Sequence, residues 1–246
     1  MTVTLSVHDV REHIRRAGSS GISRPGPSSN APLGRIFHEV AADLVSADPG
    51  ENAFSLFENL DFRREVWLSH LVSQTYEKLV GPRLARDQAR LHEASEEVLH
   101  LWGAVQSLCG WLVDLAWEAV NPTGRKRAFS WDELRMALRA EVPLEVNLRV
   151  PGWSESVRLT GVADSLLRLP RTGSWCVQEY KLGRASPEAD LAQVCLYHLI
   201  LLQAIPQRKR AGSRARNRAL ALMSFQPEMK ERVFGEKEVA TAQEKL

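Results

Sequence analysis

The sequence predicts an α/β protein in which a large helical region precedes a smaller β-β-β-α-β unit. Two hydrophobic patterns indicate this class. From Gly34 to about Val120, apolar residues recur at three- and four-residue steps, which is typical of helices that bury one face. From Val142 to Val150 they alternate with other residues, as in a strand. A chain of 246 residues is long enough for one sizeable core, or for one core with an elaborate insertion.

The β-β-β-α-β unit follows from the order of patterns after Glu141. Three strands are expected at about 142–150, 157–169 and 175–181, joined by short turns as an antiparallel meander. A long apolar helix follows, with Pro187 at its first position, and it runs to about Ala204. Residues 219–225 are apolar and predict a buried fourth strand.

The remaining segments set the predicted domain boundaries. Ser6 is a candidate N-cap for an N-terminal helix within residues 1–17, and residues 18–33 are rich in Ser, Gly and Pro, as in a flexible linker. The main domain is expected over 34–235, with a helical part at 34–140 and an α/β core at 141–225. The charged tail at 236–246 is expected to lead into a further segment of a longer protein or a larger assembly.

Composition excludes several classes of protein. Thirty-two basic and 30 acidic residues give a net charge of +2, and 44% hydrophobic residues is close to the globular average. No apolar run approaches 18 residues, and the N-terminus lacks the apolar stretch of a signal peptide. The three cysteines form no CxxC pair. We therefore expect a cytoplasmic protein with no membrane partner, no disulfide framework and no structural zinc.

One acid–base constellation stands out in the predicted sheet. Glu179 and Lys181 are two residues apart in a strand and therefore share one face. Asp164, on the preceding strand, can approach Glu179 if the two strands pair as a hairpin. Two close carboxylates favour a divalent cation such as Mg²⁺ or Mn²⁺, and the lysine could then orient a water or balance a phosphate. The alternative is a surface Glu–Lys pair with an unrelated Asp, which the spacing alone favours.

The apolar helix carries polar residues on one face. Asp190, Gln193 and Tyr197 lie at i, i+3 and i+7. A glutamine and a tyrosine on a largely buried helix must find hydrogen-bond partners. Those partners could be structural, or they could be the lysine, a water at the metal site or a phosphate of a bound strand.

In this order, the motifs resemble the RecB-type branch of the PD-(D/E)xK nuclease superfamily, which includes CRISPR-associated exonucleases. The resemblance covers roughly residues 33 to 225. It rests on the motifs Leu33-Gly-Arg-Ile-Phe-His38, Glu141-Val-Pro-Leu-Glu, Gly161-x-x-Asp164, Glu179-Tyr-Lys181 and Gln193-x-x-x-Tyr197. It implies a restriction-endonuclease-like core with a mixed sheet.

The resemblance also implies a role for each matching residue. Asp164 and Glu179 would ligate a divalent metal, joined by the carbonyl of Tyr180 and by His38 from the helical side. Lys181 would position or activate the attacking water. In addition, Gln193 and Tyr197 would hold the lysine or the substrate strand. An imidazole ligand would tilt the metal preference from Mg²⁺ toward Mn²⁺.

Two departures from the family pattern are informative. Ala163 stands where the superfamily name expects proline before the metal-binding aspartate. Relatives often carry four cysteines for an iron–sulfur cluster, but here Arg15-Arg16 occupies the first cysteine position and no cysteine follows Cys195. We therefore predict Mg or Mn as cofactor and no iron–sulfur cluster.

A basic stretch near the C-terminus is a candidate DNA contact. It contains Arg208, Lys209, Arg210, Arg214, Arg216 and Arg218 without an intervening acid. Such a stretch is usually a solvated loop, but beside a metal site it would hold backbone phosphates.

The resemblance thus implies a metal-dependent nuclease that hydrolyses phosphodiester bonds in single- or double-stranded DNA by means of a metal-activated water. It would act in DNA repair, recombination or anti-phage defence, with a helicase, another ATPase or a defence complex as partner. The sequence does not decide between exonuclease and endonuclease. The alternative is a catalytically silent nuclease fold that serves as a DNA-binding or scaffold subunit.

Overall fold

A computed structural model describes most of the chain. It describes residues 2–18, 31–46, 48, 51–87, 94–122, 128–149, 152, 154–169, 175–182, 187–204, 219–225, 229–234 and 238. The predicted linker therefore lies largely outside the described residues, as do the basic stretch from Arg208 to Arg218 and all of the predicted tail except Glu238.

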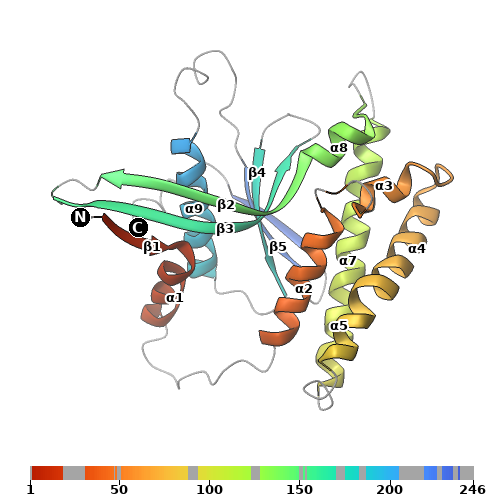
Figure 1. Ribbon diagram of the computed structural model, residues 1–246, viewed down its shortest axis with the longest axis horizontal. Helices are drawn as coiled ribbons and strands as arrows, with labels where there is room; N and C mark the ends of the chain where they lie inside the picture. Colours follow the sequence, from red (N-terminus) through yellow and green to blue (C-terminus); the bar gives the residue numbers. More distant parts are fainter. Residues whose placement is uncertain are drawn as a thin grey trace.

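The described helices pack against one sheet, which confirms the α/β class (Figure 1). The helices are α1 (Val7–Gly18), α2 (Ala31–Leu44), α3 (Ala53–Phe57), α4 (Arg64–Thr75), α5 (Gly81–Arg86), α7 (Ser95–Val120), α8 (Trp131–Ala137) and α9 (Pro187–Ala204), with a π-helical turn at Tyr76–Val80. The strands are β1 (Thr2–Ser6), β2 (Leu138–Arg149), β3 (Ser156–Arg168), β4 (Trp175–Lys181), β5 (Ala219–Ser224) and β6 (Lys230–Phe234).

The six strands form one mixed sheet in which β3 pairs with three other strands, β1, β2 and β4. β2 pairs antiparallel with β3 along almost the whole length of both strands. On the other edge of β3, β1 pairs in parallel with Ser156–Thr160, whereas β4 pairs antiparallel with Ser165–Arg168. Residues 161–164 therefore lie between the end of β1 and the start of the β4 pairing. β5 then pairs in parallel with β4, and β6 lies antiparallel at the edge.

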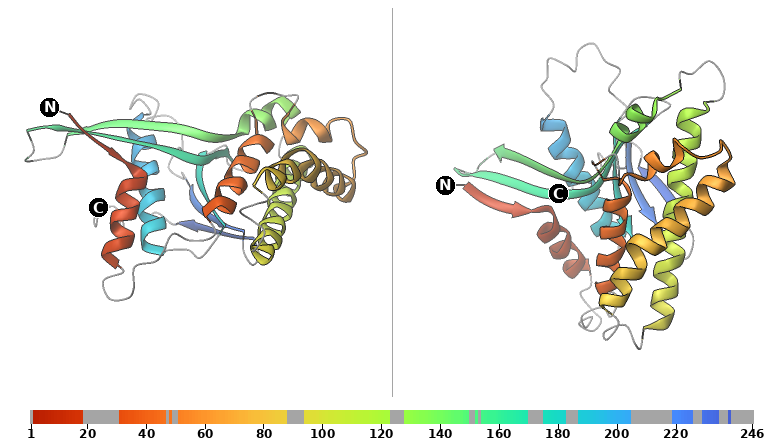
Figure 2. Two further views of the ribbon diagram at one scale, coloured as in Figure 1. Left: turned by 60° about the horizontal axis from the view of Figure 1, so that its bottom comes forward. Right: turned by 45° about the vertical axis from the view of Figure 1, so that its right-hand side comes forward.

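Each face of the sheet packs against helices of different origin. Because side chains alternate along β4, Val177 joins the apolar cluster that contains α9, whereas Cys176 and Tyr180 join the cluster that contains α2 and α7. Figure 2 shows α1 beside α9 at one end of the sheet, with α2, α4 and α7 grouped at the other. The sheet is thus enclosed by two layers, and its β3–β4 region lies between them.

One described helix, α7, is long and apolar enough to cross a membrane by length and composition alone. A helix of this kind is weak support for a membrane span because core helices of globular proteins pass the same test. Here α7 buries residues such as Leu108 and Leu112 in the helical layer.

Two strands were not predicted from the sequence. β1 precedes the expected N-terminal helix, which begins at Val7, and β6 follows the expected last strand. In addition, α2 begins at Ala31, three residues before the helical pattern was expected to resume. β3, β4 and α9 match the expected segments closely, whereas β2 begins at Leu138, four residues before the expected start at Val142.

Candidate active site

The site begins where β3 and β4 separate. Their ladder ends at the pair Ser165–Gln178, and the next residue toward the site on β3 is Asp164. In place of a further ladder bond, the backbone N–H of Tyr180 donates to Asp164 Oδ2 at 2.6 Å. The aspartate therefore spans the fork between the strands, and its position is fixed by main-chain geometry.

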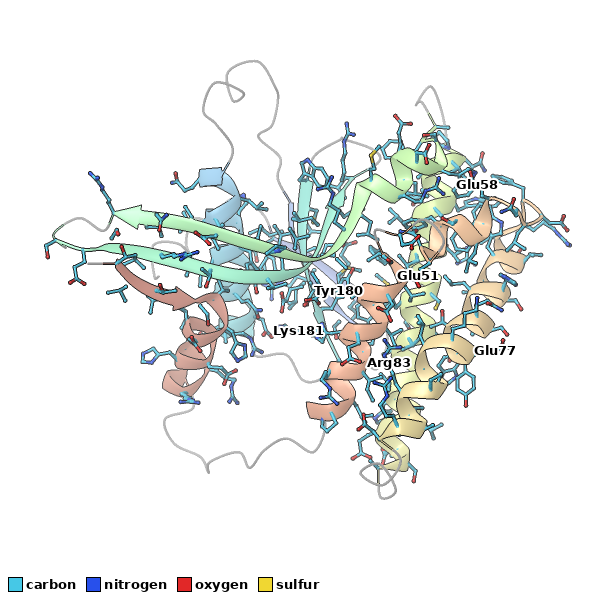
Figure 3. The ribbon with its side chains drawn as sticks, viewed as in Figure 1. Glu51, Glu58, Glu77, Arg83, Tyr180 and Lys181 are labelled. Atoms are coloured by element: carbon cyan, nitrogen blue, oxygen red, sulfur yellow. The ribbon has the colours of Figure 1, made fainter. Side chains whose placement is uncertain are left out.

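Glu179 and Lys181 project from β4 into this fork. Lys181 Nζ donates to Glu179 Oε1 at 2.8 Å and to Gln193 Oε1 at 3.1 Å. Gln193 Nε2 in turn donates to the same Glu179 oxygen at 2.7 Å. The three side chains form a closed triangle of hydrogen bonds between β4 and α9, so the lysine is the partner of Gln193 among the alternatives that the sequence left open. Figure 3 shows Lys181 and Tyr180 between α2 and the strands.

Tyr197 anchors α9 to β3. Its hydroxyl donates to the carbonyl oxygen of Val162 at 2.7 Å and lies 3.4 Å from Gln193 Nε2. α9 and α1 can approach β3 this closely only because residue 161, the first of the Gly161-x-x-Asp164 motif, is a glycine. A Cβ at Gly161 would lie 2.6 Å from Tyr197 Cε1 and 3.0 Å from Val7 Cγ2. The motif glycine therefore allows α9 and the start of α1 to pack against β3 beside the site.

His38 reaches the site from α2, the first helix of the helical layer. Its Nδ1 lies 3.2 Å from Asp164 Oδ1. Burial lowers the pKa of His38, but the hydrogen bond and the charge of Asp164, together with the charge of Glu179, outweigh this effect and raise it. The two carboxylates thus favour a positive charge at this position.

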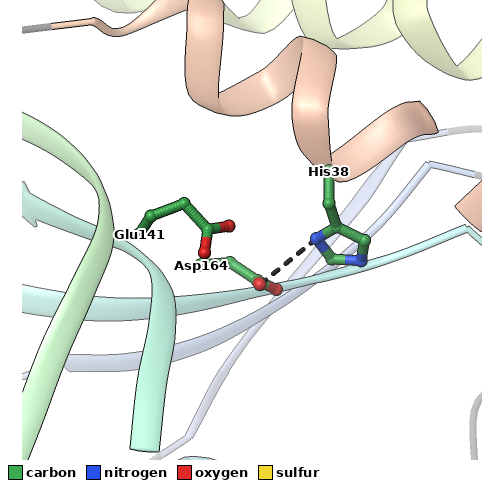
Figure 4. Close-up of side chains that lie close together, drawn as sticks. All are labelled: His38, Glu141 and Asp164. Carbon is green, nitrogen blue, oxygen red and sulfur yellow. Dashed lines mark ion pairs between the residues drawn. The ribbon is translucent and has the colours of Figure 1, made fainter. Parts of the chain in front are cut away.

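Glu141 is a site residue to which sequence reasoning gave no role. It lies opposite Asp164 on β2, with the same register on either side, and its φ of 46° is in the left-handed region. Ligand atoms of His38, Glu141 and Asp164 all lie within 4.8 Å of one another (Figure 4). A two-residue turn at Pro151-Gly152 would place Glu141 opposite Val162, whereas the observed pairing of Arg149 with Ser156 brings Glu141 opposite Asp164.

The donor set fits a divalent cation. Glu179 Oε1 accepts the bonds from Lys181 and Gln193, whereas Oε2 is buried without a hydrogen-bond partner among the described residues. Burial and the charge of Asp164 raise the pKa of Glu179. An unpaired buried oxygen close to other carboxylates is costly unless a proton or a cation satisfies it. Carboxylate oxygens with one imidazole suit Mg²⁺ or Mn²⁺.

These groups face one cavity of about 950 Å³. The side chains that line it include His38, Glu141, Asp164, Glu179, Lys181 and Gln193. Tyr180 does not line the cavity: its backbone N–H donates to Asp164, and its ring points to the opposite face of the sheet and packs against Phe225. The three cysteines are separately buried and unpaired, and no cysteine-rich metal cluster occurs among the described residues.

Comparison with known proteins agrees with this geometry at the family level. The family model of the PD-(D/E)XK nuclease superfamily matches residues 11–246, so the chain belongs to this superfamily. No curated protein gives a significant match. A solved structure described as "Crystal structure of SSO0001" matches at 13% identity and a TM-score of 0.29, covering 96% of this chain and 82% of that one. At that score the likeness supports no argument about this chain.

Proposed function

We propose that this protein is a metal-dependent deoxyribonuclease that hydrolyses phosphodiester bonds at the β3–β4 fork. The observation that carries the proposal is the convergence of Asp164, Glu179 and Lys181 in one cavity, with Gln193 tying the last two together. Membership of the superfamily supports the same reaction class.

Asp164 and Glu179 would hold the ion, with His38 and the carbonyl of Tyr180 as further ligands. Glu141 adds a fourth side chain on the β2 side. When bound, a Mg²⁺ or Mn²⁺ ion would polarise the phosphodiester and lower the pKa of a water.

Lys181 is placed to act on the reacting groups. Its ammonium is held by acceptors from β4 and α9, so its position is fixed before substrate arrives. A fixed positive charge there orients the attacking water and offsets negative charge on the phosphate. Gln193 and Tyr197 keep the lysine and α9 in place through their bonds to Glu179 and Val162.

The finer identity of the enzyme is part of the same proposal. We infer a RecB-type nuclease that acts on DNA in the cytoplasm, in repair, recombination or anti-phage defence, with a helicase or defence-complex partner. The motif set supports the branch. The basic residues from Arg208 to Arg218 would contact backbone phosphates.

Cleavage of end-labelled linear DNA tests the proposal. Wild-type protein and Lys181→Ala would be incubated with single-stranded DNA, double-stranded DNA and RNA in Mg²⁺, Mn²⁺ or EDTA. We expect DNA cleavage in either metal, no cleavage in EDTA and none by the variant. RNA cleavage alone would contradict the substrate assignment. Metal-independent cleavage would contradict the mechanism. DNA binding without cleavage in any metal would instead favour a silent scaffold.

A further inference from the structure

The cavity has a second charged wall, formed by the N-terminal helix. Arg11 lies on α1 and lines the same cavity as Lys181. Its Nε and NH2 atoms donate to Asp190 Oδ1 at 3.1 Å and 2.8 Å. The packing of α1 beside α9 in Figure 2 brings these two residues together, although they are 179 positions apart in the sequence.

Asp190 lies between two cations. Its side chain is fully buried, and Oδ1 lies 3.6 Å from Lys181 Nζ as well as within hydrogen-bond distance of Arg11. A buried carboxylate must be balanced by positive charge because transfer from water costs several kcal/mol. Asp190 Oδ1 therefore connects Arg11 of α1 to the ammonium group of Lys181.

We propose that Arg11 and Asp190 are positioning residues that set the location of the Lys181 ammonium. This inference rests on the proposed nuclease function. Lys181 Nζ is closer to Glu179 and Gln193 than to Asp190. Without Arg11, more of the negative charge of Asp190 would act on Lys181 and draw the ammonium away from Glu179. The catalytic geometry would then depend on docking of a helix outside the β-β-β-α-β unit.

The predicted effect is on turnover. Because Arg11 and Asp190 act through Lys181, Arg11→Gln should lower kcat by roughly ten- to hundredfold, the loss typical of a misplacement of about 1 Å, and leave KM close to the wild-type value. Adding Asp190→Asn to Arg11→Gln should restore most of the rate, since the negative charge that draws the lysine is removed together with the arginine that offsets it. Arg11→Lys should retain most activity because it keeps a cation beside Asp190.

The experiment measures kcat and KM for DNA cleavage in wild type, Arg11→Gln, Arg11→Lys, the double variant and Lys181→Ala, with thermal melting of each. Arg16→Gln, an exposed arginine on the same helix, is the matched control and should behave as wild type. Recovery of kcat in the double variant, with little change in melting temperature among the variants, is the expected result, because loss of a merely structural contact would lower the melting temperature of Arg11→Gln.

Three outcomes would overturn the inference. If Lys181→Ala is inactive but Arg11→Gln turns over at the wild-type rate, the positioning role is wrong and the nuclease function stands. If Arg11→Gln raises KM and leaves kcat unchanged, Arg11 binds substrate directly. If wild-type protein cleaves no nucleic acid in any metal, the proposed function fails and the positioning role fails with it.

Discussion

Asp164 is approached from three elements, and this arrangement would favour a bound cation. The backbone of β4 donates to one of its oxygens, His38 from α2 approaches the other, and Glu141 of β2 lies opposite it. Like charges placed directly opposite each other destabilise a sheet. Burial and the charge of Asp164 also raise the pKa of Glu141. The free protein therefore holds these carboxylates at a cost that a bound ion would relieve.

Glu141→Gln separates the repulsion between the carboxylates from the role of Glu141 as a metal ligand. Removing one charge relieves repulsion, so we expect the free energy of unfolding in EDTA to rise by about 0.2–1 kcal/mol. Removing an oxygen ligand should weaken Mn²⁺ binding by roughly ten- to hundredfold. Denaturant melts and Mn²⁺ titration measure the two quantities. Glu145→Gln, on the same strand, is the control and should leave the affinity unchanged. An unchanged Mn²⁺ affinity in Glu141→Gln would show that Glu141 is not a ligand.

Gly161→Ala tests the close packing at the motif glycine. The added methyl group would lie 2.6 Å from the ring of Tyr197 and 3.0 Å from Val7, so ring and helix must move. We expect a loss of about 1–3 kcal/mol in the free energy of unfolding. Gly110→Ala is the matched control, because nothing lies within 4 Å of its new methyl group and alanine favours helix. Equal stability of the two variants would contradict the packing.

The sequence indicated most of the residues of the site and missed Glu141 and Arg11. His38, Asp164, Glu179, Lys181, Gln193 and Tyr197 were indicated by the motifs and the family resemblance, and the structure places all six around one cavity. Their catalytic roles stay predictions. Glu141 was missed because its position depends on a left-handed backbone conformation, which non-glycine residues rarely adopt and which no local pattern signals.

Between elements, the bond from Tyr197 to Val162 joins α9 to β3. Tyr197→Phe removes this bond and leaves a carbonyl without that donor, so we expect a loss of about 0.5–1.5 kcal/mol in the free energy of unfolding. Chemical denaturation measures the change. Tyr76→Phe, whose ring is half exposed, should change stability by less than about 0.5 kcal/mol. A Tyr197→Phe variant as stable as wild type would show that the bond does not contribute to docking of α9.

The elements that the sequence predicted are those with strong burial patterns. β2, β3, β4 and α9 each carry an apolar face that packs against a neighbour, and the alternation or helical spacing follows directly. β1 and β6 are mostly exposed, so they lack that alternation. Their pairing with β3 and β5 depends on contacts that no local window contains.

For the whole molecule, the buried carboxylate links stability to pH and metal. The pKa of Glu179 is raised to about 8, chiefly by burial and then by Asp164. A raised pKa means that the stability contribution of this group is full below the usual value near 4.5 and is lost as pH rises toward 8. Metal binding requires the ionised form and so compensates for this loss.

We therefore expect Mn²⁺ to raise the melting temperature more at about pH 8 than at about pH 6, relative to EDTA. The increase should be smaller, and should change less with pH, in Glu179→Gln. Differential scanning fluorimetry over this range measures the effect. A wild-type increase that is equal at all pH values would show that ionisation of Glu179 is not linked to metal binding.

Direct measurement of Mn²⁺ binding tests the central claim, because a silent scaffold has no reason to keep these carboxylates together. Loss of the free-ion signal in electron paramagnetic resonance would be followed for wild type, Asp164→Asn and the exposed control Asp61→Asn. We predict saturable binding by wild type and Asp61→Asn, and loss of that binding in Asp164→Asn. Equal binding by all three, or by none, would contradict a metal site at the β3–β4 fork.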